Sequence, residues 1–150
     1  MSSSQLYVED LHVGQRFVSS EVEITEHEIK DFAKAFDPQP FHLDGEAAKE
    51  TLFKGLAASG WHTSALTMRL NVESLPLVGG VLGMGVEVEW NAPVRPGDVL
   101  HVESEVVEIA PAKPGARRGV VVILGRTVNQ KGEIVQTNKA KLLVSRRPGG

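Results

Sequence analysis

The sequence predicts an α+β fold in which an antiparallel β-sheet wraps around one long central α-helix. Two observations support this prediction. Residues 61–74 form one long, largely apolar segment, which is typical of a buried helix. Between residues 81 and 144, four segments follow one another with short turns that contain Pro and Gly. Short turns join antiparallel strands, and such a sheet needs an apolar layer on one face, which the helix supplies.

The chain before the central helix predicts a strand and then a short helix. Residues 16–24 alternate loosely between apolar and polar side chains, which indicates a strand. Thr25 stands three residues before Glu28, so the two can form a capping box at a helix start. Apolar residues then recur at helical spacing, and a short amphipathic helix is therefore expected over residues 25–36.

Two prolines end this helix. Neither Pro38 nor Pro40 can donate a backbone hydrogen bond, and each biases the residue before it toward extended geometry. Residues 37–43 are therefore expected to form a stiff, non-helical loop. Asp44 follows and is suited to cap a second short helix over residues 45–51.

The central helix and the strands make up the rest of the chain. Ser59 is suited to cap the helix over residues 61–74. After residue 78 the pattern changes to alternation, and the short turns predict a four-stranded antiparallel meander. The strands are expected over residues 81–90, 99–109, 120–128 and 134–144.

Length and targeting signals indicate one soluble domain. The 150 residues fit a single domain, 1–150, whose ordered part is expected to span about residues 6–145. No basic segment followed by an apolar one opens the chain, so no signal peptide is expected. No apolar stretch is long enough to span a membrane. A cytoplasmic location without membrane contact is therefore the expectation.

Composition excludes several kinds of partner and site. The chain has no cysteine, which excludes disulfides, thiolate metal sites and a cysteine nucleophile. The net charge of -3 argues against nucleic acid as a partner, because nucleic-acid binders usually carry a basic stripe. No metal site is expected, because three histidines have no neighbouring ligands at metal spacing: His12, His27 and His101.

Asp37 and His42 are the residues that indicate acid–base catalysis. They stand five residues apart in the proline-stiffened loop, beside apolar side chains such as Phe41. A carboxylate and an imidazole held in this way can converge on one water molecule. Partial burial is expected to raise the pKa of Asp37 and to lower that of His42. Both values would then approach neutral pH, where acid–base catalysis is most effective.

Gly60 stands where the central helix begins. The first amides of a helix have no partner, glycine lets a ligand approach closely, and the helix dipole adds partial positive charge. These properties suit the oxyanion that develops on a thioester carbonyl. A structural interpretation is also open, in which Asp37 and His42 are loop residues and Gly60 allows tight helix packing.

Two motifs together resemble those of a known family. One is Asp37-x-x-Pro40-x-His42-x-Asp44, followed by Ser59-Gly60 at the start of the central helix. The other is Asn91-Ala-Pro-Val-Arg-Pro-Gly-Asp98, which follows a predicted strand. The combined pattern is similar to that of the MaoC-like dehydratases, which include the (R)-specific enoyl-CoA hydratases, and the resemblance covers residues 13–144.

The resemblance implies a hotdog fold, a homodimer or higher homo-oligomer, and an enoyl-CoA or 3-hydroxyacyl-CoA substrate bound near the dimer interface. It implies a hydratase or dehydratase, a lyase of fatty acid metabolism, with no cofactor beyond the coenzyme A of the substrate. By position, Asp37 and His42 activate water and move a proton to or from the α-carbon, and Gly60 binds the thioester oxygen. The candidate pocket-lining residues are Gln39, Phe41, Ser59, Trp61 and His62, and for His62 packing or a partner contact is the preferred interpretation.

Two positions depart from the family pattern, and two other functions stay open. Gln39 stands where the family usually has Asn, and Ser59 stands where it usually has His. Neither change affects the catalytic pair, but both bear on which substrate the protein accepts. A thioesterase on the same fold would need a carboxylate near the helix start, where none of Ser59, Trp61 and His62 is acidic. A non-catalytic acyl-CoA-binding dimer is the third possibility, and the intact pair of Asp37 and His42 argues against it.

Overall fold

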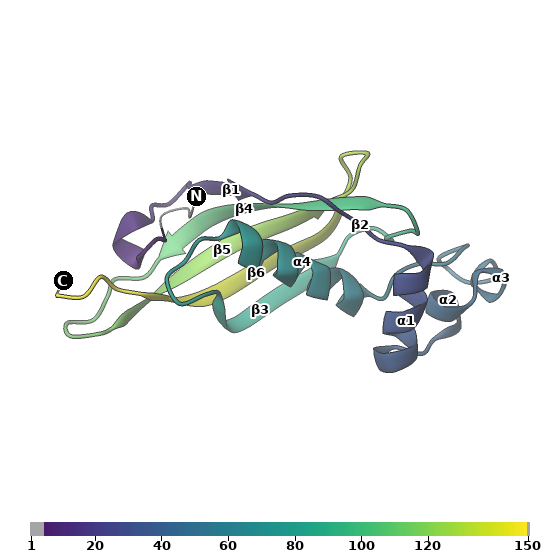
Figure 1. Ribbon diagram of the computed structural model, residues 1–150, viewed down its shortest axis with the longest axis horizontal. Helices are drawn as coiled ribbons and strands as arrows, with labels where there is room; N and C mark the ends of the chain where they lie inside the picture. Colours follow the sequence, from purple (N-terminus) through teal and green to yellow (C-terminus); the bar gives the residue numbers. More distant parts are fainter. Residues whose placement is uncertain (1–4, 150) are drawn as a thin grey trace.

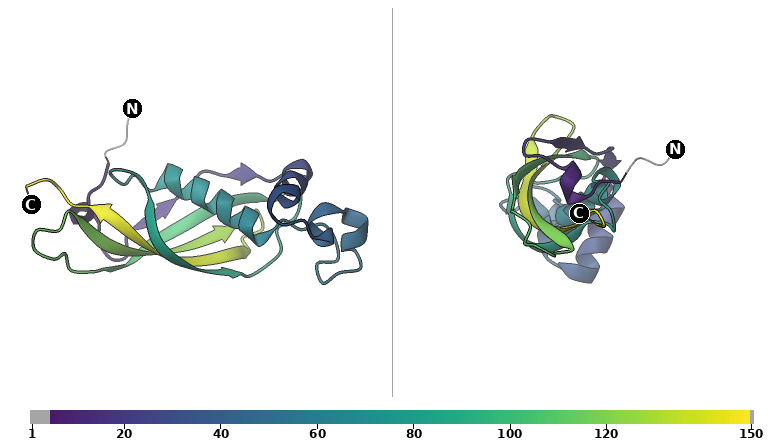
Figure 2. Two further views of the ribbon diagram at one scale, coloured as in Figure 1. Left: turned by 90° about the horizontal axis from the view of Figure 1, so that it is seen from below. Right: turned by 90° about the vertical axis from the view of Figure 1, so that its left-hand side faces the viewer.

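A computed structural model describes residues 5–149 as one curved antiparallel sheet with a long helix, α4 (Gly60–Ser74), against one face (Figure 1). The two views in Figure 2 show the sheet curving around this helix, with three short helices together at one end. The other helical segments are η1 (Val8–Asp10), α1 (Glu26–Phe36), α2 (Pro40–Leu43) and α3 (Gly45–Ala48). The strands are β1 (Arg16–Val18), β2 (Val22–Glu23), β3 (Leu82–Trp90), β4 (Val99–Ile109), β5 (Arg118–Val128) and β6 (Ile134–Ser145).

The segment expected as one strand over residues 16–24 is two short strands, β1 and β2, which both pair with β4. Ser19 interrupts them. Its N–H donates to the carbonyl of Val102 at 2.9 Å, and its hydroxyl accepts the N–H of Val102 at 2.8 Å. A side chain that replaces a ladder hydrogen bond in this way splits the strand, which the loose alternation of the sequence did not predict.

The strand order is β1-β4-β5-β6-β3, so the expected four-stranded meander is wrong for β3. β4, β5 and β6 do form a meander, but β3 pairs with β6 at the far edge of the sheet. Pro93 and Pro96 stand in the connection from β3 to β4, and Val94 in it is buried and accepts the N–H of Ala58 at 2.8 Å. The connection is thus packed against the segment before α4 instead of closing a hairpin. As a result β3 has one strand neighbour and a free edge within residues 5–149.

The helix predictions are confirmed except in the proline loop. Thr25 caps α1, since its hydroxyl accepts the N–H of Glu28 at 3.2 Å, and the carboxylate of Glu28 accepts the N–H of Thr25 at 3.1 Å. Asp44 caps α3, which ends at Ala48 and is shorter than expected. Residues 40–43 form the short helix α2, so the expectation of a wholly non-helical loop was wrong. Pro40 is its first residue, where a fixed φ and a missing N–H cost nothing.

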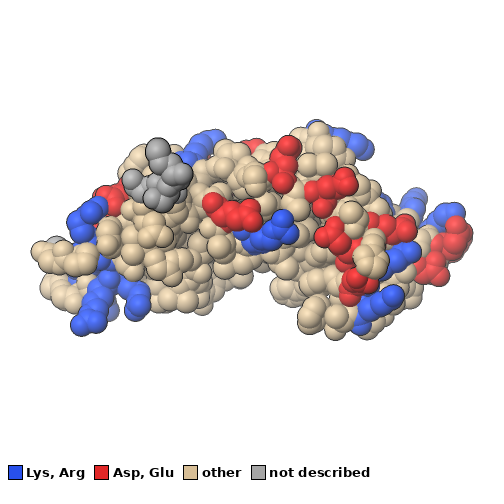
Figure 3. All heavy atoms as spheres, viewed as in Figure 1, with Lys and Arg blue, Asp and Glu red and all other residues tan. Residues whose placement is uncertain are grey.

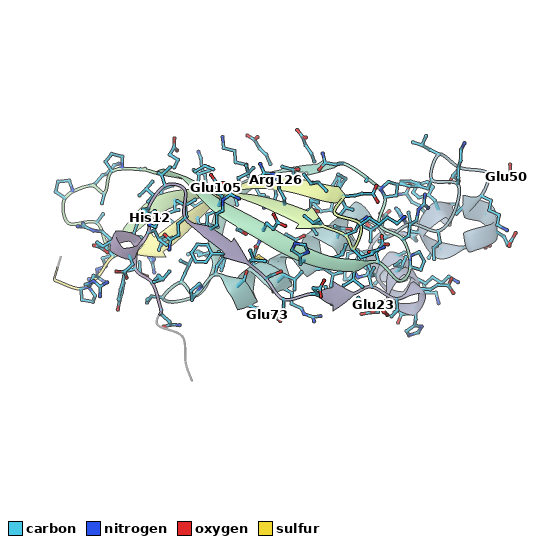
Figure 4. The ribbon with its side chains drawn as sticks, turned by 90° about the horizontal axis from the view of Figure 1, so that it is seen from above. His12, Glu23, Glu50, Glu73, Glu105 and Arg126 are labelled. Atoms are coloured by element: carbon cyan, nitrogen blue, oxygen red, sulfur yellow. The ribbon has the colours of Figure 1, made fainter. Side chains whose placement is uncertain are left out.

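Buried and more exposed side chains alternate along β4 as far as the register shift between Val106 and Glu108. On β4, Leu100, Val102 and Val106 are buried beneath α4. Figure 4 shows Glu105 and Arg126 on the side of the sheet turned away from α4. This alternation is the period of two that an antiparallel sheet with one covered face requires. Within residues 5–149, no helix has both the length and the apolar content needed to cross a bilayer.

The end of the chain is anchored as far as the structure describes it. Arg147 donates to both carboxylate oxygens of Asp10, at 2.6 and 2.7 Å. The N–H of Arg146 donates to the carbonyl of Arg117 at 2.8 Å. These hydrogen bonds join residues 146 and 147 to η1 and to the turn before β5. Residues 1–4 and 150 lie outside the described part.

Candidate active site

Asp37 stands directly after α1, where its carboxylate is held by two donors. The hydroxyl of Ser59 donates to Oδ2 at 2.7 Å, and the side-chain amide of Gln39 donates to Oδ1. Ser59 is fully buried and also caps α4 by accepting the N–H of Trp61 at 3.2 Å. One hydroxyl thus ties the carboxylate to the start of the central helix. Each donor occupies a different oxygen, so the orientation of the carboxylate is fixed.

His42 lies in α2 and is buried, with 4 % of its surface exposed. Its Nδ1 lies 2.6 Å from the carbonyl oxygen of Ala57. A carbonyl can only accept a hydrogen bond, so in the neutral ring Nδ1 carries the proton and Nε2 is left with a lone pair. Nε2 lies 3.4 Å from Oδ2 of Asp37, which is longer than a normal hydrogen bond. A water molecule can therefore contact both atoms.

The pKa of Asp37 lies below its ordinary value, and the expectation that it would be raised is therefore wrong. Burial on its own raises this pKa. Hydrogen bonds from Gln39 and Ser59, together with the nearby imidazole of His42, stabilise the carboxylate and outweigh that effect. Asp37 is consequently ionised at neutral pH and acts there as an acceptor.

Gly60 is the first residue of α4, and its amide has no acceptor among the described residues. The indole of Trp90, at the end of β3, packs directly on it. The Trp90 Nε1–H donates to the carbonyl of Gly60 at 2.9 Å. A Cβ added to Gly60 would lie 2.5 Å from the indole ring, closer than atoms can approach. This position therefore requires glycine.

Asp37, His42 and Gly60 all line one hollow of about 520 Å³. Trp61 and Trp90 also line it, with their rings in edge-to-face contact at 5.1 Å. A carboxylate, an imidazole nitrogen with a free lone pair and an unpaired helix amide thus meet in one cavity. This is the arrangement needed to activate water beside a carbonyl group whose oxygen becomes negatively charged.

Four of the predicted lining residues do not line the hollow: Gln39, Phe41, Ser59 and His62. Phe41 packs on the edge of the His42 ring at 4.6 Å and so positions it. His62 does not line the hollow, because its ring stacks on Phe32 of α1 at 4.6 Å. Burial lowers the pKa of His62, an effect that nearby Glu28 only partly offsets, so the ring is neutral at pH 7. Its position indicates a packing role.

Arg95 is a positioning residue that sequence reasoning missed. Its guanidinium donates to the carbonyls of Gly55 at 2.9 Å, Leu56 at 3.2 Å and Phe53. This clamp holds the segment that leads into Ala57, the acceptor for His42. The Pro-Val-Arg-Pro-Gly-Asp motif contained the signal, since it places one arginine in a turn that is otherwise without a long side chain.

Comparison with known proteins identifies the family. The MaoC-like domain model matches residues 10–132. The chain belongs to the MaoC-like domain family. It is similar to the 3-hydroxybutyryl-CoA dehydratase of Methylorubrum extorquens, with 32 % identity over 97 % of this chain and 94 % of that protein. The MaoC-like dehydratase of Rhodospirillum rubrum superposes with a TM-score of 0.92 and 54 % identity, over 95 % of this chain and 99 % of that one.

A second solved structure bears on the fold. The R-hydratase of Pseudomonas aeruginosa superposes with a TM-score of 0.78 and 30 % identity, over 95 % of this chain and 88 % of that one. Because the match extends over nearly the whole sheet and its helix, the predicted α+β hotdog fold of this MaoC-like protein is confirmed.

Proposed function

We propose that this MaoC-like protein is a hydro-lyase that adds water to an enoyl-CoA thioester or removes it from a 3-hydroxyacyl-CoA. The observation that carries the proposal is that Asp37, His42 and the free amide of Gly60 face one hollow. The hydratases and dehydratases among its relatives support the same conclusion. Coenzyme A enters as part of the substrate, and the reaction needs no further cofactor.

The geometry leads to a specific sequence of proton movements. Water held between Asp37 Oδ2 and His42 Nε2 adds through its oxygen to the β-carbon of the enoyl group. His42 accepts a proton from this water at Nε2, because Nδ1 already donates to Ala57. The ionised Asp37 stabilises the imidazolium that forms. The negative charge moves to the thioester oxygen, which the Gly60 amide binds, and the proton held by His42 then passes to the α-carbon.

A direct assay tests this function. The purified protein is mixed with crotonyl-CoA, and the loss of the conjugated enoyl absorbance is followed while free thiol is titrated in parallel. We expect the absorbance to fall with no release of thiol, because hydration leaves the thioester intact. Release of thiol would instead establish a thioesterase. Tight binding without either change would establish a non-catalytic acyl-CoA-binding protein.

Removing a donor to Asp37 is expected to change the pH dependence. In Ser59→Ala the carboxylate loses one hydrogen bond, so its lowered pKa rises toward the ordinary value. The reaction requires the ionised form, and the acidic limb of kcat/KM therefore moves to higher pH. Gln39→Leu removes the donor to the other oxygen and should move the limb in the same direction. The pH profile of kcat/KM for crotonyl-CoA hydration measures both shifts. An acidic limb at the same pH in the parent and in both variants would contradict the proposed effect of the two donors on Asp37.

We also propose that the protein is a homodimer joined through β3. Among the residues that the structure describes, no strand pairs with the outer side of β3, and three of its apolar side chains are about half exposed: Leu82, Met84 and Val86. Met68 and Val72 of α4 are exposed as well. In Figure 3 the lower middle of the face, over β3 and the neighbouring side of α4, carries few charged atoms. A second copy can pair with the edge and cover this surface by two-fold symmetry.

A charge placed on the β3 edge is expected to separate the dimer. Met84→Lys buries an unpaired ammonium in the proposed interface, which is strongly unfavourable. Light scattering after gel filtration should give twice the 16.2 kDa chain mass for the unsubstituted protein and the single mass for the variant. Val18→Lys, at a valine that is 67 % exposed against 56 % for Met84 and lies on the opposite edge strand, is the matched control and should stay dimeric. A dimeric Met84→Lys would place the interface elsewhere.

A further inference from the structure

Gln136 of β6 is a polar side chain that is almost wholly buried, with 1 % of its surface exposed. It faces α4, because its amide contacts Ser64 and Thr67 of that helix. A buried amide is unfavourable unless its polar atoms are hydrogen-bonded, and an apolar side chain could fill the same space at lower cost. The hydrogen bonds of Gln136 therefore indicate what an amide provides at this position.

The side-chain oxygen of Gln136 accepts hydrogen bonds from two other elements. The hydroxyl of Ser64 in α4 donates to Oε1 at 2.8 Å, and the Nε1–H of Trp90 donates to the same atom at 3.1 Å. Trp90 stands directly opposite Gln136 in the pairing of β3 with β6. An indole nitrogen can only donate, so the amide atom that faces it must be the oxygen. One oxygen atom thus joins β6 to both α4 and β3.

The indole of Trp90 links this oxygen to the start of α4. Its Nε1–H also donates to the carbonyl of Gly60 at 2.9 Å, and its ring lies against the α-carbon of the same residue. Trp90 is 46 % exposed, so packing holds the indole on one side only. The hydrogen bond to Gln136 fixes the nitrogen of the ring from within the protein. Gln136 thereby fixes the indole, and the indole fixes Gly60.

The nitrogen of the Gln136 amide is held less closely than the oxygen. Nε2 lies 3.5 Å from Oγ1 of Thr67, at the outer limit of a hydrogen bond. The Thr67 hydroxyl has a much shorter contact, at 2.6 Å, with the hydroxyl of Thr127. Both short hydrogen bonds of Gln136 are therefore made by Oε1, the atom that faces Trp90 and the first turns of α4.

We infer that Gln136 is a positioning residue for the oxyanion site, and that it acts through Trp90 to hold the Gly60 amide toward the thioester oxygen. The inference rests on the proposed function, because it takes this amide as the oxyanion donor. Gln136 does not line the hollow that Asp37 and His42 share, so it acts at one remove from the substrate. An oxyanion donor that is displaced loses stabilisation mainly of the transition state, where the charge develops.

Loss of the acceptor oxygen is expected to lower kcat more than it changes KM. Gln136→Met fills a similar volume without the amide oxygen, and we expect kcat for crotonyl-CoA hydration to fall about tenfold, the scale of one hydrogen bond. KM should change by less than about twofold, because binding of the ground state does not depend on the oxyanion. Gln136→Glu keeps an oxygen at the same place and should keep most of the rate. An unchanged kcat in Gln136→Met, or an equal loss in both variants, would overturn the inference.

A double-variant cycle tests whether Gln136 acts through the indole. Trp90→Phe keeps an aromatic ring but removes the Nε1–H, and it should lower kcat about as much as Gln136→Met. In the Trp90→Phe background, Gln136→Met should cost less than about a further twofold, because the two residues act in one chain of contacts. A second tenfold loss would show that Gln136 acts independently of Trp90 and would overturn the inference. Should Gln136→Met not fold, a parental kcat in Trp90→Phe, which changes a partly exposed residue, would overturn it as well.

Asn138→Leu is the matched control for loss of a buried amide. Asn138 lies two residues further along β6 and is 7 % exposed, and its Oδ1 has no hydrogen-bond partner among the described residues. Its replacement should leave kcat unchanged. A tenfold loss there would show that kcat responds to the loss of any buried amide on this strand, which would overturn the inference.

Nuclear magnetic resonance of the indole N–H groups tests the contact without turnover. The Trp90 signal is identified as the one that remains in Trp61→Phe, and it should move in Gln136→Met and stay in place in Asn138→Leu. A Trp90 signal that does not move in Gln136→Met would overturn the inference. This result is independent of the hydration assay on the unsubstituted protein, which alone decides the proposed function.

Discussion

Asp37→Asn is expected to lower kcat/KM for crotonyl-CoA hydration by at least about a hundredfold, the usual scale for an acid–base group. The amide keeps the size of the carboxylate but has no negative charge with which to stabilise the imidazolium of His42. It also presents only one acceptor where Ser59 and Gln39 each donate to a different oxygen. The initial rate of absorbance loss over a range of substrate concentrations measures the effect.

Asp44→Asn is the matched control for this variant. Asp44 stands seven residues later and also caps a short helix, but it does not line the hollow. Asn is as good a helix cap as Asp, so this variant should keep its activity. An Asp37→Asn protein that melts like the parent and hydrates crotonyl-CoA at a similar rate would rule out the proposed role of Asp37.

Gly60→Ala is expected to reduce kcat by about two orders of magnitude, which is the usual cost of losing one oxyanion donor. The added methyl group would lie 2.5 Å from the indole of Trp90, so either the start of α4 or the indole must move. Movement of the helix start takes the free amide away from the thioester oxygen. Steady-state kinetics with crotonyl-CoA should show the loss mainly in kcat.

The double variant Gly60→Ala, Trp90→Leu separates the steric cause from other causes. The smaller leucine removes the ring that the new methyl group strikes, so part of the lost rate should return relative to Gly60→Ala alone. Trp90→Leu by itself provides the reference rate. Full activity in Gly60→Ala would show that close contact at this helix start is not needed for catalysis.

The parts of the fold that depend on neighbouring residues could be predicted from the sequence. The caps at Thr25, Asp44 and Ser59 each act within three residues, and all three predictions are confirmed. The edge position of β3 could not be predicted in this way. It depends on the packing of the proline-containing connection against the segment before α4, and these parts of the chain are more than thirty residues apart.

In the candidate site, too, contacts between residues close in sequence could be predicted and contacts between distant residues could not. Asp37 and His42 are close in sequence, and the structure brings them to one hollow as their spacing predicted. The hydrogen bond from Ser59 to Asp37 joins residues 22 positions apart, and the contact of Trp90 with Gly60 joins residues 30 apart. The expected direction of the Asp37 pKa shift was wrong, because burial could be expected from the apolar neighbours but the hydrogen bonds from Gln39 and from the distant Ser59 could not.

The central claim is that Asp37 and His42 add water to the carbon chain of an enoyl thioester. Mass spectrometry after reaction of crotonyl-CoA in ¹⁸O-labelled water tests it most directly. We predict that one labelled oxygen appears in the acyl chain of an intact 3-hydroxybutyryl-CoA, and that Asp37→Asn and His42→Ala form this product at least about a hundredfold more slowly. Label in a free carboxylate with released coenzyme A, or undiminished product in either folded variant, would contradict the claim.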